Sequence, residues 1–177
     1  MPDVDAVVGV SDHGGWAVLV TVAGDGTLLD RRRVELVGDD LPALPHHHEG
    51  QLLPPDEGVA LVERVRASAE KHSALALNAL SSSIHGIRGV ALRACPPLPS
   101  TIAERITDYR SRNVADWVMY RQVLAAAAAN RGWTVHWYEA KALDVDDSAF
   151  DLRKRLGPPW SKDHKLAMAA ARDAIGS

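Results

Sequence analysis

The sequence has almost no cysteine: its 177 residues include Cys95 alone. A single thiol excludes an intrachain disulfide, and chains without disulfides are typical of reducing compartments. No apolar run is long enough to span a bilayer, and the first residues lack the basic, apolar and cleavage regions of a signal peptide. These absences predict a cytoplasmic protein with no membrane partner.

The sequence also lacks an excess of positive charge. Lys and Arg total 20 against 23 Asp and Glu, which gives a net charge of −3. Dedicated nucleic-acid binders are usually basic, so this balance argues against one, although local patches matter more than the sum. Apolar residues make up 46% and charged residues 24%, as in ordinary globular proteins. Because no repeat, linker or boundary interrupts the chain, we predict a single domain over residues 1–177.

The stretch 4–13 is the centre of the predicted fold. It is apolar through Val10, as in a strand buried on both faces, and turns polar at Ser11, Asp12 and His13. A glycine pair follows and allows a tight turn. Polar residues at the carboxyl end of a central strand lie at the rim of the sheet, where α/β folds place ligands. Asp12 is therefore the first candidate for chemistry.

The other elements follow from apolar periodicity. Predicted strands cover 16–23, 27–37, 87–94 and 133–138, and predicted helices cover 57–72 with an extension to 80, 114–130 and 162–175. Tight turns join the first three strands into an antiparallel meander, and strands alternating with helices join in parallel. The prediction is an α/β fold with a mixed five-stranded sheet flanked by helices. The first helix should bury Val59, Val62 and Val65 and expose Arg64 and Arg66.

Local signals refine this outline. The run Arg31–Arg33 cannot face a core, so its strand should lie at an edge or on a solvated face. Asn113 with Asp116 three residues later is a capping signature for the helix over 114–130, and Ser161 is the predicted cap of the last helix. Short helical segments are also predicted near 101–109 and 149–156.

The order of elements resembles the ribonuclease H-like fold, and within it the Holliday-junction resolvase branch. Three stretches carry the resemblance: Val7–Gly14 is similar to the first strand with its acid and glycine turn, Val135–Leu143 to the fifth strand, and Ser161–Ala171 to the final helix. The resemblance implies a nuclease that acts on nucleic-acid phosphodiesters. It also implies clustered carboxylates that hold two divalent cations, Mg²⁺ or Mn²⁺, to activate water.

Carried over residue by residue, the resemblance implies that Asp12 and Asp163 are the metal ligands and that His164 belongs to the site. Ser11 lies one place nearer the expected register of the first-strand acid. If both carboxylates hold a cation, we expect them within about 4 to 7 Å of each other. The family's glutamate on the fourth strand is missing, and Arg93 stands near that position.

An arginine cannot ligate a metal and repels one. Glu139 is the predicted substitute and a candidate catalytic residue, with Asp144, Asp146 and Asp147 as alternatives. The missing acid supports a second hypothesis, a degenerate ribonuclease H-like module for binding or assembly. Its partner would be nucleic acid, another protein or a second copy of the chain.

One further stretch, His46–Glu49, carries ligand types that suit a transition metal such as zinc. The alternative is a solvated polar loop, because adjacent residues rarely converge on one ion. A phosphotransferase of the related actin-like superfamily is disfavoured, since those enzymes normally use a duplicated fold and a glycine-rich phosphate loop.

Overall fold

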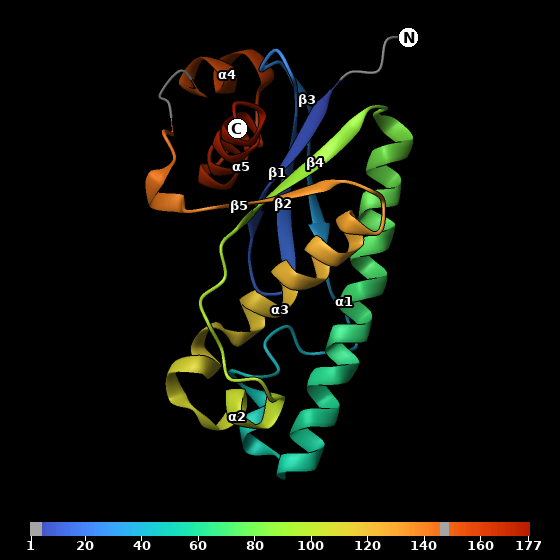
Figure 1. The fold of residues 1–177 in the computed structure, drawn as a ribbon, viewed down its shortest axis with the longest axis vertical. Coiled ribbons are helices and arrows are strands. Elements are labelled where there is room, and N and C mark those ends of the chain that lie inside the picture. The colour runs from blue at the N-terminus through green and yellow to red at the C-terminus, as the bar shows by residue number, and fades with distance from the viewer. Residues whose placement is uncertain (1–4, 146–148) are drawn as a thin grey trace.

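A computed structural model describes residues 5–145 and 149–177 of the chain. Its core is a five-stranded sheet in the order β3-β2-β1-β4-β5 (Figure 1). The strands are β1 (Ala6–Asp12), β2 (Trp16–Ala23), β3 (Leu28–Glu35), β4 (Ile87–Arg93) and β5 (Thr134–Tyr138). β1, β2 and β3 pair antiparallel, whereas β4 pairs parallel with β1 and β5. The predicted mixed sheet is confirmed, with β1 at its centre.

Helices cover both faces of this sheet (Figure 1). The long helices α1 (Pro55–Ser83) and α3 (Tyr109–Ala129) pack on one face, and α5 (Lys162–Ile175) packs on the other. Shorter elements are η1 (Glu49–Leu52), α2 (Ile102–Thr107), η2 (Ala140–Ala142) and α4 (Ala149–Leu156). None of the helices within 5–145 and 149–177 is long and apolar enough to cross a membrane.

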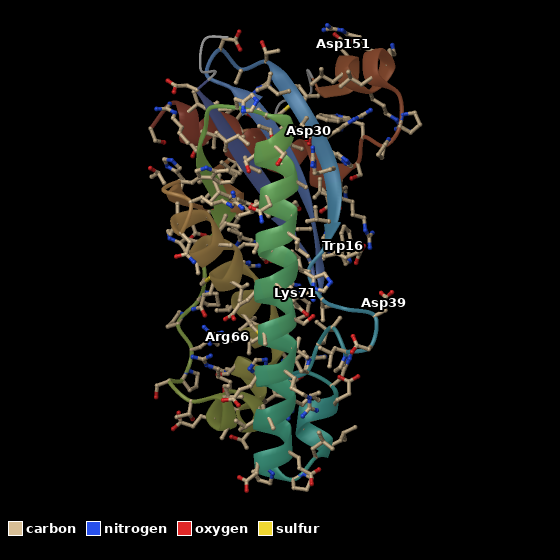
Figure 2. All side chains as sticks on the ribbon, turned by 90° about the vertical axis from the view of Figure 1, so that its right-hand side faces the viewer. Trp16, Asp30, Asp39, Arg66, Lys71 and Asp151 are labelled. Atoms are coloured by element: carbon tan, nitrogen blue, oxygen red, sulfur yellow. The ribbon has the colours of Figure 1, made fainter. Side chains whose placement is uncertain are left out.

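The first helix is longer than predicted. It continues through the segment 73–83, because Leu77 and Leu80 extend its buried stripe by further turns and are fully buried. Val62 and Val65 are buried as expected, and Val59 is partly buried. Figure 2 views α1 from outside the molecule, with the exposed Arg66 along it. The assigned helical face is therefore correct.

The start of α3 corrects the sequence prediction. The helix begins at Tyr109, and its cap is Asp108, whose carboxylate accepts from the Ser111 backbone N–H at 2.8 Å. The Asn113–Asp116 pair therefore lies inside the helix and does not cap it. Asp116 instead faces the loop that follows β3, where its carboxylate is fully buried.

Alternation along β1 divides the interior into two cores. Val8 and Val10 pack with α1 and α3, whereas Val7 packs with α5. Gly9 faces α5 at the crossing point, and a Cβ atom there would lie 1.7 Å from the Ala167 carbonyl oxygen. The missing side chain allows α5 to lie directly on β1, which brings the first turn of α5 to the carboxyl end of the strand.

The arginines of β3 lie on an edge strand, as predicted. Arg32 pairs with Asp30 at 2.7 Å, and Arg33 pairs with Glu35 at 3.0 Å. Arg31 instead donates to three backbone carbonyls at the end of α4 and in the segment that follows, those of Leu156, Gly157 and Pro159. This guanidinium therefore holds the connection to α5 against the sheet edge.

We expect Gly9→Ala to destabilise the protein by about 3 kcal/mol or more, because the added methyl meets backbone and no flexible side chain can yield. Equilibrium urea unfolding measures the change. Gly176→Ala is the matched control, since a Cβ at Gly176 meets its nearest atom at 3.7 Å. Equal stability of the two variants would contradict the close contact between α5 and β1.

Candidate functional site

Two neighbouring residues at the end of β1 point to opposite faces of the sheet. The Ser11 hydroxyl donates to Asp163 of α5 at 2.7 Å. Asp12, one residue later, accepts from Arg121 of α3 at 2.8 Å. This follows from strand alternation, which places successive side chains on opposite faces. The two predicted metal ligands, Asp12 and Asp163, thus bond with partners on different sides of β1.

Asp12 belongs to a buried ion pair. The side chains of Asp12 and Arg121 are 1% and 10% exposed, and the guanidinium also donates to the Ala94 carbonyl at 3.1 Å. Burial raises the pKa of Asp12, and the attraction and hydrogen bond of Arg121 only partly offset this. The pair joins β1, the residue after β4, and α3, so Asp12 has a structural partner where a cation was expected.

Asp163 occupies the first turn of α5 and is held by two donors. Its Oδ1 atom accepts from Ser11 and lies 2.7 Å from His13 Nε2. Burial alone would raise the pKa of Asp163, but the hydrogen bonds from His13 and Ser11 outweigh it, and the pKa is lowered. The carboxylate is thus ionised and occupied by groups of the β1–β2 turn.

His164 caps the helix and does not join Asp12. Its Nδ1 atom accepts the Ser161 backbone N–H at 3.1 Å, and the residue is 5% exposed. Burial, reinforced by the positive charge of Arg31, lowers the pKa of His164. The neutral ring therefore carries its proton on Nε2. The predicted start of the last helix at Ser161 is confirmed.

The other described candidate acids are exposed, and they join no metal-binding group of three or more His, Cys, Asp and Glu side chains within residues 5–145 and 149–177. Glu139 is exposed between β5 and η2, and Asp144 is exposed after η2. Asp146 and Asp147 lie outside the described residues. The structure therefore does not bring Asp12, Asp163, Glu139 and His164 into one group.

Arg93 is the last residue of β4, near the position where the resemblance implies a glutamate. The last register pair of β1 and β4 is Gly9 with Ala91, and Ser11 and Arg93 each lie two residues beyond it. Ala91 packs in the core beneath α5, and Arg93 therefore faces the same side. Its side chain is exposed, and within the described part of the chain its guanidinium forms no hydrogen bond or ion pair. An exposed cation stands where the resemblance implies an acid, and its charge opposes the rise in the pKa of Asp12.

These residues do not fit a site for two divalent cations. Across residues 5–145 and 149–177, no group of three or more His, Cys, Asp and Glu side chains is placed to hold a metal ion. The Asp12 carboxylate is paired with Arg121 and faces α3, and the positive charge of Arg93 also acts on Asp12. Two closely spaced cations need several negative ligands to offset their mutual repulsion.

The histidine run after β3 has a structural role that the sequence analysis missed. His46 is 1% exposed, and its Nδ1 atom lies 2.7 Å from Asp116 Oδ1. The same carboxylate accepts the backbone N–H groups of His46 and His47, both at 3.0 Å. Tyr120, one turn further along α3, donates to the loop at the Ala43 carbonyl. Asp116 and Arg121 were detectable as charges within an otherwise apolar helical stretch, although their partners were not.

Comparisons with known proteins agree with this architecture. No sequence family matches the chain, and no curated protein is similar to it in sequence. A solved structure, T. thermophilus RuvC in complex with Holliday junction substrate, superposes with a TM-score of 0.52 at 16% identity. The match covers 96% of this chain and 92% of that one. The fold is therefore ribonuclease H-like, as the order of elements predicted.

Removing the Arg121 side chain should leave the buried Asp12 carboxylate without its hydrogen-bonded ion-pair partner. We expect Arg121→Met to lower the free energy of unfolding by about 3 to 5 kcal/mol, because Asp12 loses the guanidinium that hydrogen-bonds to it. The double variant Asp12→Leu with Arg121→Met should regain much of this loss, since no unpaired charge remains. Denaturant unfolding of the single and double variants tests the coupling. Additive losses would show that the pair is not coupled.

His164 should contribute to acid sensitivity. Its folded pKa lies below the ordinary 6.5, so the unfolded chain binds more protons between the two values. The unfolding free energy should therefore fall as pH drops below about 6.5. His164→Asn keeps an acceptor for Ser161 but does not titrate, so its stability should decline less between pH 7 and pH 5. Parallel slopes for both proteins would contradict the buried neutral ring.

Proposed function

We propose that this protein is a catalytically degenerate ribonuclease H-like module that binds branched or hybrid nucleic acid without cleaving it. The observation that carries the proposal is Arg93, an exposed guanidinium at the carboxyl end of β4 that forms no hydrogen bond or close ion pair within the described residues. The metal-dependent nuclease implied by the resemblance is the competing function, and the tests below separate the two.

The charges around this site favour binding without cations. Asp12 is ion-paired with Arg121, and Asp163 is hydrogen-bonded by Ser11 and His13, whereas the exposed guanidinium of Arg93 has its hydrogen-bond donors available to a ligand. A guanidinium matches phosphate oxygens in geometry and binds them through two parallel hydrogen bonds. The positive end of the α5 dipole lies beside Asp163 and adds further attraction for an anion. A phosphodiester is therefore attracted here without a bound metal.

The ligand class follows from fold and from charge together. The similar solved structure is described as a complex with Holliday junction substrate, which makes a four-way DNA junction the first ligand to test. The net charge of −3 suits a small number of local phosphate contacts better than a wide basic surface. Binding should accordingly show a shallow dependence on salt.

The test measures binding and cleavage side by side. Labelled four-way junctions and RNA–DNA hybrids are titrated with protein and followed by fluorescence anisotropy, with EDTA or with Mn²⁺, and the same samples are run on denaturing gels. We expect binding in EDTA and no cleavage in Mn²⁺. Robust cleavage that Asp163→Asn abolishes would contradict this proposal and support the nuclease. Absence of binding would also contradict it and would support a module that binds another protein.

Arg93→Gln should weaken junction binding by about fivefold to tenfold and reduce the salt dependence by about one phosphate contact. Arg88→Gln is the matched control, because Arg88 is an exposed arginine on the same strand, at its opposite end. Its affinity should equal that of the unmodified protein. Equal losses for the two variants would indicate a general charge effect and would contradict a specific role for Arg93.

A further inference from the structure

Three flat side chains form a stack beside this site: His13, Trp16 and Arg33. The His13 and Trp16 rings are 4.0 Å apart between centroids and inclined by only 6°. The Arg33 guanidinium carbon lies 3.8 Å from the centre of the same indole. Two groups this close to one ring centre must lie on opposite faces of it, so Trp16 is the middle layer.

The stack is held in place through hydrogen bonds to its two outer members. His13 Nε2 bonds with Asp163, and Arg33 Nε donates to Glu35 at 3.0 Å. Such bonds lie near the plane of each group and leave its outer face open. The outer members are correspondingly accessible, with side-chain exposures of 40% for His13 and 54% for Arg33. Figure 2 shows Trp16 at the edge of the molecule, away from α1.

The position of His13 connects the stack to the phosphate-binding edge. His13 and Ser11 both bond to Asp163, and both Ser11 and Arg93 lie two residues beyond the last register pair of β1 and β4, Gly9 with Ala91. Arg33 lies further away, because β3 and β4 are separated by β2 and β1. His13 and Ser11 thus share Asp163, and the exposed ring of His13 lies at the carboxyl end of the central strand, at the edge where we propose that phosphate binds.

We propose that the open face of the His13 imidazole receives an unpaired base of the bound nucleic acid, extending the stack of His13, Trp16 and Arg33 by one layer. This inference rests on the proposed function and adds the feature that the protein recognises, an unstacked nucleotide. Every base presents a π-face, so stacking of this kind tolerates sequence but requires that the base be free of the duplex. The branch point of a junction supplies such bases.

The test uses two duplexes of equal length, each with one bulged position, a normal nucleotide in one and an abasic residue in the other. Both retain the backbone phosphates, so their affinities differ only through the base. Fluorescence anisotropy in EDTA should show tighter binding of the base-containing duplex by about fivefold or more. His13→Ala should abolish this preference and leave the abasic affinity nearly unchanged.

His13→Phe keeps a flat ring without the bond to Asp163 and should retain the preference, which separates stacking from charge. His85→Ala, at an exposed histidine before β4, is the control and should behave as the unmodified protein. Equal losses of both ligands in His13→Ala would overturn the stacking proposal while leaving nucleic-acid binding intact. No binding of either duplex by the unmodified protein would overturn both proposals.

Discussion

The ion pair between Asp12 and Arg121 is the constraint on which the centre of the molecule depends. It lies where the central strand, the residue after β4, and α3 meet, and its two side chains are almost fully removed from solvent. Burying a carboxylate is costly unless a hydrogen-bonded cation accompanies it. Asp12 therefore requires Arg121, and α3 is held against the carboxyl ends of the strands by that requirement. The same pairing occupies the first-strand carboxylate and directs it away from α5.

The architecture could be predicted from the sequence, because period-2 and period-3.6 patterns report which side of an element is buried. Strand order follows from turn lengths and crossovers, and the arginines of β3 correctly indicated an edge. The boundaries of α1 and α3 were less accessible. Leu77 and Leu80 continue a buried stripe that local propensity alone does not extend, and Asp108 acts as the cap that Asn113 was expected to provide.

The site was harder to predict because its geometry depends on a one-residue difference in register. Ser11 and Asp12 face opposite sides of the sheet. Asp12 has the residue type that the resemblance implies, whereas Ser11 has the position that it implies. The partners Arg121 and Asp116 lie 109 and 70 residues along the chain from Asp12 and His46, on a helix whose orientation no local pattern reveals. His46 illustrates the same limit, since a histidine run typical of a metal site is instead anchored to Asp116.

The arginine on β4, where the resemblance implies an acid, is consistent with the other features of this edge. A cluster of carboxylates repels phosphate until cations neutralise it, so an acidic site binds nucleic acid only together with its metals. Here Asp12 is paired with Arg121, and Asp163 is held by Ser11 and His13. Arg93 is exposed at the end of β4, and it is the residue through which we propose that a phosphate binds. Because the fold places β1, β4 and the start of α5 together, the same backbone can present either acids or an arginine at this edge, and the proposed function depends on which residues occupy it.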